Sequence, residues 1–555
     1  MHQQIDETKN DQKLDFKHPL WLWLIPLVSA ILFDQLFWRK TPGVVFLAIV
    51  ILILLGGFIN ALIQKKHVPF TSWILLLPIL FGAVMTIFRL DAFTNAANIL
   101  VSLYALVLLA MTFLNGEWFT YRLRDILEGA VKLFVSILID PIRLLVSSVK
   151  KNAQKAPGEK RASSRKISAV LRGLLIALPL VIILGALLAS ADLIFSEKIT
   201  GAFKWLKIEN FGQFVFRFIY VMVLAYGLCG AFIYILSQTQ PKQAKTEEKP
   251  FVAPFLGKTE ALIVLACVNL LFAVFLVVQF RYFFGGNANI TFEGFTYAEY
   301  ARKGFFELVT VAIISLLLFF VLSHITKRSA GRERWIFSIL GILLILQVGV
   351  MLLSAHYRLS LYETAYGFTQ ARTVTHVFII WLAVLLPAMV VLEVSQRLGR
   401  VAIVLFLVAV GFMVTLNFIN VDKFIVEKNI THASEDNDLD IHYLVWSLSE
   451  DGTPALFDAY LAPNMDPDLK QQIGAVLACR SVNAETRSEN WSWVSWHASR
   501  DKASQLYKEN APLLADYELQ DSEEGYWTVI LNGKTRPCYD LVHGFETQKG
   551  ADFLD

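Results

Sequence analysis

Long uninterrupted apolar runs are the feature of this chain that most restricts how it can fold. Each run holds about 18 or more residues with few or no charges, which is enough for a helix to cross the ~30 Å hydrocarbon layer of a bilayer. The runs are continuous and too long for the strands of a membrane barrel, so only helices fit them. We predict eleven spans, at residues 20–38, 43–63, 72–90, 95–114, 168–191, 212–236, 258–281, 304–324, 333–354, 372–393 and 399–419.

The composition agrees with an all-α polytopic membrane helix bundle. Hydrophobic residues make up 55% of the chain and charged residues 17%, whereas a soluble domain has about 25% charged residues. The net charge of +3 is too small to indicate a nucleic-acid partner, so the partner we expect is the lipid bilayer. The first apolar run follows a polar tail and lacks a small-residue cleavage site, so it is predicted to be a retained span.

Basic residues lie in alternate connections between the predicted spans, and this alternation sets the orientation. With eleven spans they all fall on one side, which is predicted to be the cytoplasm. Residues 1–19 then form a cytoplasmic N-terminal tail, residues 20–419 the transmembrane region, and the C-terminus lies outside the cytoplasm. The basic residues concerned are Lys65, Lys66, Lys150, Lys151, Lys155, Lys160, Arg161, Arg165, Lys166, Lys242, Lys245, Lys249, Lys327, Arg328, Arg332, Arg334, Arg397 and Arg400.

Residues 119–149 are the segment that leaves this topology ambiguous. Apolar residues recur there at helical spacing with charged residues off the stripe, and Asp140–Pro141 is expected to interrupt the pattern. We predict an amphipathic helix in the inner interface followed by a basic cytoplasmic loop, together covering 119–167. If the segment crosses the bilayer instead, the orientation of the first four spans inverts. The stripe consists of Leu127, Val131, Phe134 and Leu138.

The chain changes character after the last span. Residues 420–555 contain no apolar run long enough to cross, so we predict a small extracytoplasmic soluble domain of α or α+β class. Residues 440–448 and 496–514 are expected to be helical. Residues 526–531 are expected to form a strand, followed by a turn at Asn532–Gly533.

Cysteines, histidines and tryptophans in this domain raise three further questions. Cys479 and Cys538 can form a disulfide outside the cytoplasm, and the alternative is two buried thiols. The histidines show no metal-ligand spacing, so no metal site is predicted. The tryptophans are expected in the domain core, with binding of a sugar or a lipid headgroup as the alternative. These residues are His432, His442, His497, His543, Trp491, Trp493 and Trp496.

Charged residues gather near the outer ends of predicted spans eight to ten. A charge at the membrane centre costs roughly 2.5–3.5 kcal/mol, so such residues must be paired or must face water. Several of them share one face of a helix, as Arg372 and His376 do at the start of span ten. The candidate polar cluster comprises Glu299, Arg302, Lys303, Glu307, Arg358, Glu363, Arg372 and His376.

Two interpretations of this cluster stay open. Opposite charges at helix ends can staple helices together, which we favour, or they can form a site for a substrate, an ion or a lipid. His376 is expected to be a hydrogen-bonded packing residue, with a proton relay as the alternative. Asp34, Asp192 and Arg217 are predicted to lie in the same outer layer.

Three motifs, in this order along the chain, resemble an uncharacterised family of bacterial polytopic membrane proteins called domain of unknown function 4153/4173. The resemblance covers about residues 260–460. It implies a bacterial membrane location, which we take to be the cytoplasmic (inner) membrane, and it brings no activity or catalytic residues. The motifs are TYAEYARKGFFELV (296–309), LYETAYGFTQARTVTHVFIIWLA (361–383), and NVDKFIVEKNI (420–430) followed by LDIHYLVWSLSEDGTPAL (439–456).

No sequence pattern assigns a reaction. The chain has no P-loop, no H-E-x-x-H and no G-x-S-x-G, so no catalytic residue is predicted and no cofactor is expected. We favour a non-enzymatic envelope scaffold or sensor whose C-terminal domain binds a partner such as another envelope protein. The alternative is a transporter or channel-like protein for a small solute, ion or lipid, and a membrane-embedded enzyme is a weaker third option. The lack of a convincing internal repeat favours the scaffold or sensor.

Overall fold

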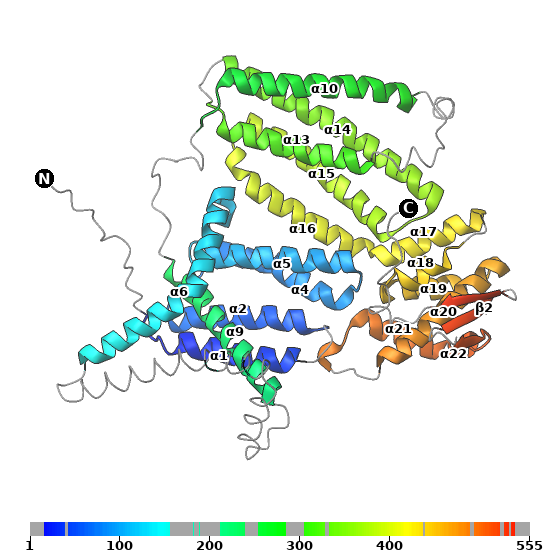
Figure 1. The fold of residues 1–555 in the computed structure, drawn as a ribbon, viewed down its shortest axis with the longest axis horizontal. Helices are drawn as coiled ribbons and strands as arrows, with labels where there is room; N and C mark the ends of the chain where they lie inside the picture. Colours follow the sequence, from blue (N-terminus) through cyan, green and yellow to red (C-terminus); the bar gives the residue numbers. More distant parts are fainter. Residues whose placement is uncertain are drawn as a thin grey trace. The chain divides into compact units, whose positions relative to one another are not determined.

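The computed structural model of this chain describes residues 16–38, 43–155, 181, 188, 211–238, 254–284, 305–327, 332–436, 439–488, 493–521, 527–531 and 534–538 (Figure 1). Within these ranges, nine helices are long and apolar enough to cross a membrane, so the protein is a multi-pass membrane protein. They are Val45–Ile63, Phe70–Phe88, Ala92–Thr112, Gly212–Ser237, Lys258–Gln279, Phe306–Ile325, Arg334–Tyr366, Gln370–Val394 and Leu398–Ile419.

The predicted count of eleven spans depends on two further segments. The first predicted span is helix α1 (Trp21–Phe37), whose 17 residues make it shorter than the nine. The predicted fifth span, 168–191, lies outside the described residues apart from Val181 and Leu188. The number eleven therefore stays a prediction.

The chain divides into two compact units, of which the first holds residues 1–77, 105–118 and 125–241. In this unit α1 packs along α9 (Phe211–Ser237), and α2 (Val45–Ile63) packs against both of them. Helix α3 (Phe70–Ile74), most of α6 (Leu123–Lys155) and the end of α5 (Ala92–Thr112) also belong to this unit.

Helix α6 corrects one prediction. It runs without a break through Pro141, where the sequence suggested an interruption at Asp140–Pro141. Proline removes one backbone donor from a helix, and here the backbone of α9 supports α6 one turn earlier. A Cβ added to Gly230 would lie 2.5 Å from the Cα of Ile137, so only glycine permits this close approach. The predicted apolar stripe, including Val131 and Phe134, is exposed.

The second unit holds residues 78–104, 119–124 and 242–555. Its long helices run side by side (Figure 1). Apolar residues of the first four of them form one core. Parts of α4 (Leu76–Phe88) and α5 (Ala92–Thr112), and the short η1 (Trp118–Thr120), also belong to this unit. The long helices are α10 (Lys258–Phe284), α13 (Phe305–Ile325), α14 (Arg332–Tyr366), α15 (Gln370–Val394) and, after the short η3 (Leu398–Arg400), α16 (Val401–Ile419).

Helix α14 is longer than predicted. The ninth span was expected to end at residue 354, whereas the helix continues to Tyr366. Ala355, Leu359 and Glu363 follow one another at the spacing of one turn and are all buried, so one packed face extends the helix. Gly367 then adopts a φ of 72°, a left-handed conformation that ends helices readily.

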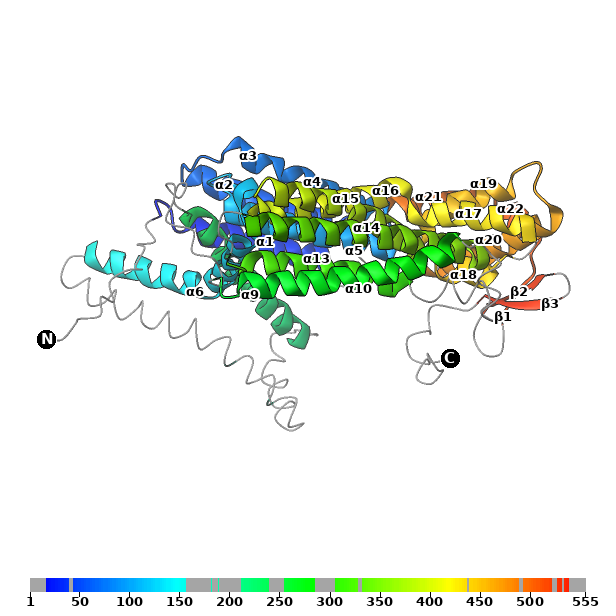
Figure 2. The same ribbon diagram turned by 90° about the horizontal axis from the view of Figure 1, so that it is seen from above.

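The C-terminal helices gather at one end of α14, α15 and α16 (Figures 1 and 2). Sequence patterns missed α17, α19 and α20. Residues 473–480 of α20 are all buried, so this central helix has no polar face whose periodicity could reveal it. The helices are α17 (Val421–Asp436), α18 (Ile441–Trp446), η4 (Glu450–Gly452), α19 (Thr453–Tyr460), α20 (Pro467–Ser488), η5 (Trp493–Ser495), α21 (Ala498–Glu509) and α22 (Ala511–Leu514).

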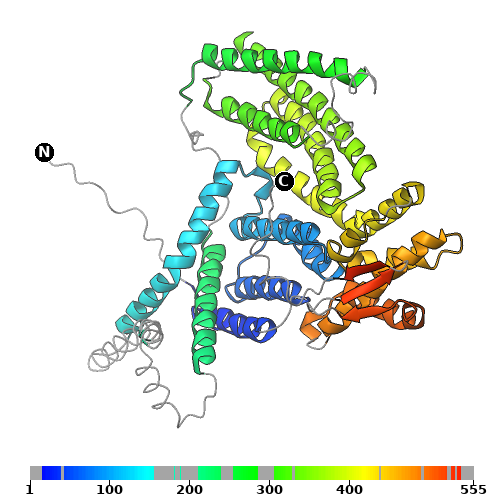
Figure 3. The ribbon, with the colours of Figure 1, turned by 45° about the vertical axis from the view of Figure 1, so that its right-hand side comes forward.

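A small antiparallel sheet packs beside α20 (Figure 3). Its strands, in the order β1 (Leu519–Asp521), β2 (Trp527–Leu531) and β3 (Lys534–Cys538), make this region α+β. Cys479 of α20 and Cys538 of β3 form a disulfide, with their Cα atoms 5.5 Å apart. The bond fastens the last strand to the central helix of the region.

Removing this disulfide is expected to destabilise the C-terminal region. It closes a loop across a sequence separation of 59 residues, and losing such a constraint costs about 2–4 kcal/mol, chiefly by freeing the unfolded chain. The double variant Cys479→Ser with Cys538→Ser should therefore show a lower Tm in detergent. An unchanged Tm would contradict a stabilising role for the bond.

Two tryptophans do not lie in the core, contrary to prediction. Trp493 is 71% exposed and Trp496 is 42% exposed, although Val494 and Ser495 between them are buried. Trp491 lies outside the described residues.

Candidate functional site

The predicted polar cluster is only partly described by the structure. Glu299, Arg302 and Lys303 lie outside the described residues. Glu307 is exposed in the first turn of α13, one turn after Lys303, so its expected partner is not described. The remaining four residues lie on α14 and α15.

Glu363 and His376 meet, and they form a chain with a second histidine. Nε2 of His376 lies 2.7 Å from Oε2 of Glu363, and Nδ1 of His376 lies 2.9 Å from Nδ1 of His356. His356 and Glu363 belong to α14, so this chain joins α14 to α15. One of the two facing Nδ1 atoms must carry the proton that the other accepts. These contacts therefore join the two helices through polar side chains.

Glu363 is the most confined member of this chain. It is 4% exposed, and its Oε1 has no hydrogen-bond partner among the described residues. A buried oxygen without a hydrogen-bond partner lowers the stability of the folded protein.

Arg372 contacts backbone carbonyls and an aromatic ring. Its Nη1 donates to the carbonyl oxygens of Tyr366, at 3.1 Å, and of Gly367. Its guanidinium lies over the ring of Tyr362, 4.1 Å from the centroid. Arg372 thus covers the C-terminal end of α14, while Arg358 lies partly buried on the same helix.

Three buried aspartates lie where the C-terminal helices meet the ends of the membrane helices, and sequence analysis singled out none of them. Oδ2 of Asp451 accepts the backbone N–H groups of Leu90, at 2.7 Å, and Asp91, at 3.4 Å. Oδ1 of Asp451 accepts the hydroxyl of Ser499. Because Asp451 belongs to η4, it ties the C-terminal region to the α4–α5 connection.

The other two aspartates make similar connections. Asp422, in the first turn of α17, accepts the side-chain N–H of Gln370 at 2.6 Å and the backbone N–H of Ser449 at 2.6 Å. Asp91 accepts the backbone N–H of Thr94 at 2.8 Å and so caps α5. Oδ2 of Asp91 has no hydrogen-bond partner in the described part of the chain.

Arg89 fixes the same corner from the other side. Its Nε and Nη2 donate to the carbonyl oxygen of Asn417, at 3.1 and 2.6 Å, near the end of α16. Its own carbonyl lies 3.3 Å from Nε2 of His497. Asn98 and Asn417 exchange two side-chain hydrogen bonds, at 3.2 and 2.6 Å. The α4–α5 connection, the end of α16 and the C-terminal region therefore form one bonded junction.

Burial and mutual repulsion keep these acids from ionising readily. Burial, followed by the charge of Asp422, raises the pKa of Asp91 to about 7. Burial also raises the pKa of Asp422 and of Asp451 above their ordinary values. Burial lowers the pKa of His497 to about 4, so this imidazole is neutral at physiological pH.

Asp91 is expected to make the free energy of unfolding decrease as the pH rises. Its folded pKa of about 7 lies above the ordinary 3.8, so its contribution is fully present below about pH 4 and is lost as pH rises through 7. Asp91→Asn should remove part of this slope and stabilise the protein at pH 8 by on the order of 3 kcal/mol. Melting curves between pH 5 and 8, run beside Asp440→Asn at a helix cap away from the junction, check this. Equal slopes in wild type and Asp91→Asn would contradict the assignment.

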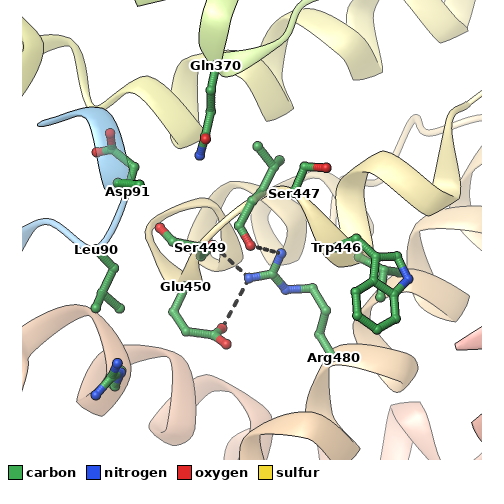
Figure 4. Close-up of a pocket in the computed structure, with 12 residues that line it drawn as sticks. Leu90, Asp91, Gln370, Trp446, Ser447, Ser449, Glu450 and Arg480 are labelled. Atoms are coloured by element: carbon green, nitrogen blue, oxygen red, sulfur yellow. Dashed lines mark hydrogen bonds and ion pairs between the residues drawn. The ribbon is translucent and has the colours of Figure 1, made fainter. Parts of the chain in front are cut away.

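A pocket of about 290 Å³ opens beside these acids (Figure 4). Asp91 and Leu90 line one side, Gln370 projects toward it from α15, and Arg480 lies opposite (Figure 4). Neither Glu307 nor Arg372 lines this pocket. Its wall combines carboxylate, amide and guanidinium groups with apolar side chains. The full lining is Leu90, Asp91, Ala92, Gln370, Val445, Trp446, Ser447, Leu448, Ser449, Glu450, Arg480 and Arg500.

Arg480 organises the wall of this pocket. It is 4% exposed, and its guanidinium donates to the carbonyl oxygens of Leu444, Leu448 and Ser449 at 2.8, 3.2 and 2.7 Å. It also pairs with Glu450 at 3.3 Å. The arginine thereby holds together the segment that follows α18. Ser449 and Asp451, which take part in the junction, belong to this segment.

The remaining predicted polar residues belong to the first unit. Asp34 of α1 and Arg217 of α9 form an ion pair in which Nε of Arg217 lies 3.0 and 3.2 Å from the two carboxylate oxygens. Tyr220 also donates to Asp34, and the guanidinium lies 5.3 Å from the ring centroid of Trp38. These contacts staple α1 to α9. Asp192 lies outside the described residues.

A signal for the missed aspartates was present in the sequence. Asp422 and Asp451 fall within the quoted family motifs, and Asp91 follows directly on a predicted span. The backbone donors Leu90 and Asp91 lie 361 and 360 residues from Asp451, so no local spacing could have paired them. No group of three or more potential metal-binding side chains occurs among the residues that the structure describes.

Comparisons with known proteins assign a family and nothing beyond it. The family model described as Domain of unknown function (DUF4153) matches residues 75–459. This match confirms the family suggested by the three motifs and extends well before residue 260, where the motif resemblance began. No curated protein and no solved structure matches the chain.

Proposed function

The chain belongs to the family described as domain of unknown function DUF4153, and from that premise, which supplies no activity, we propose that it is a membrane scaffold or sensor of the bacterial inner membrane. Its C-terminal region is rigidly fastened to the outer ends of the membrane helices. A partner protein outside the cytoplasm then binds the surface of the C-terminal region, which the membrane helices hold in a fixed position.

The hydrogen-bonded junction is the observation that carries this proposal. Asp451 receives three donors, Asp422 receives two, and Arg89 is held by a carbonyl of α16. Both carboxylates are almost fully buried. Breaking such bonds inside the protein costs roughly 1–3 kcal/mol for each orphaned group, so the junction resists opening. A protein that must rock between two states gains nothing from locking these elements together.

Hydrogen exchange of the full-length protein in lipid nanodiscs tests the proposal. The backbone N–H groups of Leu90, Asp91 and Ser449 are bonded to the two carboxylates, so we expect them to exchange as slowly as the interior of α14. Asp451→Asn, which keeps an acceptor at the same place, serves as the matched control. Fast exchange at these amides while the helices stay protected would contradict a rigid junction.

The alternative, a transporter, is favoured by one observation, the chain from Glu363 through His376 to His356. A proton-coupled carrier needs titratable groups in contact inside its helices. Proteoliposomes that contain a pH-sensitive dye separate the two functions, because a scaffold should leave them as proton-tight as protein-free vesicles. Proton flux that His376→Gln abolishes would establish the transporter instead.

Counting crossings supports an even number of spans between the α4–α5 connection and the C-terminal region. Asp451 bonds to the α4–α5 connection, so both must lie on the same side of the bilayer. Seven of the nine candidate spans lie between residues 91 and 420, all except Val45–Ile63 and Phe70–Phe88. An odd number of crossings would separate the two sites, so one more is required. The predicted span at 168–191 supplies it if α6 lies in the interface, as predicted from its apolar stripe.

Thiol labelling tests the absolute orientation. The predicted side of the C-terminal region is extracytoplasmic, consistent with the disulfide there. After mild reduction of spheroplasts, a membrane-impermeant maleimide should label Cys479 and Cys538 once the region is unfolded by urea outside the sealed membrane. Labelling only after membrane lysis would reverse the orientation.

A further inference from the structure

Two exposed tryptophans lie at η5, Trp493 within it and Trp496 directly after it. Trp493 and Trp496 expose most or much of their side chains, whereas Val494, Ser495 and His497 are buried. The segment 493–497 is therefore anchored through its buried residues, and its two indoles are left outside the core. Large exposed aromatic residues in a fixed segment mark a surface that contacts something apolar.

The contacts of the next residues place this segment at the end of a membrane helix. Nε2 of His497 lies 3.3 Å from the carbonyl oxygen of Arg89, and the hydroxyl of Ser499 donates to the carbonyl oxygen of Phe88 at 2.8 Å. Phe88 is the last residue of the candidate span Phe70–Phe88. Trp496 directly precedes His497, and consecutive Cα atoms are about 3.8 Å apart. Trp496 therefore lies close to the end of this span.

We propose that Trp493 and Trp496 insert into the headgroup layer of the lipid bilayer and brace the C-terminal region against the membrane surface. This layer extends roughly 5–8 Å beyond the hydrocarbon on each side. Tryptophan is enriched there because its ring is apolar while its N–H still finds a polar partner. Phe88 and Phe93, at the facing ends of α4 and α5, are exposed as well and continue the same aromatic belt.

The groups that hold the segment suit a position beside lipid. His497 is neutral because burial lowers its pKa to about 4, so it brings no charge that the interface would have to solvate. Ser499 bonds to Asp451 and to Phe88 together. The segment that carries the two tryptophans is thus connected to the junction. The end of α4, as the end of a membrane span, lies next to the bilayer.

Site-directed fluorescence on the full chain tests the insertion. Trp493→Cys and Trp496→Cys are made singly in a Cys267→Ala background, because Cys267 is exposed whereas Cys229 is buried. The disulfide is kept oxidised, and each thiol is labelled with bimane in vesicles of phosphatidylethanolamine and phosphatidylglycerol. Leu513→Cys is the matched control, since Leu513 is also exposed and α22 lies farther than α21 from the membrane helices (Figures 1 and 2).

The two labelled positions should be quenched several-fold more by headgroup-nitroxide lipids than the control, and several-fold less by aqueous iodide. The same quenching at Trp493, Trp496 and Leu513 would overturn the proposal, and so would access by iodide alone, which would point to a soluble partner. If the cysteine variants do not fold, 5-fluorotryptophan in the intact chain provides the second readout. Signals assigned with Trp493→Phe and Trp496→Phe should then broaden with nitroxide lipid, and unbroadened signals would equally overturn the proposal.

Discussion

Asp451→Ala is expected to lower the free energy of unfolding by about 2–6 kcal/mol, because it leaves two backbone donors without their acceptor at about 1–3 kcal/mol each. The donors are the N–H groups of Leu90 and Asp91, whereas the hydroxyl of Ser499 can still donate to the carbonyl oxygen of Phe88. Removing the charge also relieves its repulsion of Asp91. That effect is the smallest of the causes that act on the pKa of Asp91, so it does not offset the loss.

The matched control for this variant is Asp451→Asn. Its amide oxygen can still accept from Leu90 and Asp91, and the Ser499 hydroxyl can turn to accept from the new amide N–H. We therefore expect Asp451→Asn to retain most of the stability. The measurement is the Tm of the purified protein in detergent together with protease sensitivity of the C-terminal region. If the alanine and asparagine variants melt alike, the hydrogen bonds do not hold the junction.

Arg480→Ala is expected to cost about 3–5 kcal/mol, the range for breaking a buried ion pair by removing one partner. The variant leaves Glu450 without its cation and strips three carbonyl oxygens of their donor. The segment between α18 and η4 should loosen as a consequence, and with it the wall of the pocket.

Two further variants separate charge from geometry at this site. Arg480→Lys keeps the charge, but one ammonium group cannot reproduce the fork of donors that reaches Leu444, Leu448 and Ser449, so it should recover only part of the loss. Arg480→Ala combined with Glu450→Gln should be more stable than Arg480→Ala alone, because no unpaired carboxylate remains. The midpoints of urea unfolding of the four proteins decide. An Arg480→Lys midpoint equal to wild type would show that the carbonyl contacts carry no stability.

Sequence reasoning anticipated the membrane class because each span carries its own signal. Twenty consecutive apolar residues need no partner to be recognised. It also selected Glu363 and His376, which the structure joins at 2.7 Å, because both lie in a short segment between apolar runs. It missed that Glu363 is helical, since the packed face through Ala355 and Leu359 extends α14 beyond its apolar run.

The acid junction was out of reach for a different reason. Leu90 and Asp451, which share a hydrogen bond, lie 361 residues apart. Each residue alone resembles an ordinary helix cap or loop residue, and only the folded chain shows that both are buried. The exposed position of Trp493 was equally hidden, because an aromatic cluster in a small domain usually fills its core.

The long separation between Arg89 and its acceptor Asn417, 328 residues along the chain, also bears on biogenesis. The α4–α5 corner is synthesised early, yet the groups that bond the Arg89 side chain and the backbone N–H of Asp91 arrive only with the last span and the segment beyond it. Until translation ends, this corner carries unmet polar groups that quality-control proteases can recognise. A chain truncated after the last span should therefore be degraded as incompletely assembled, even though all its membrane helices are present.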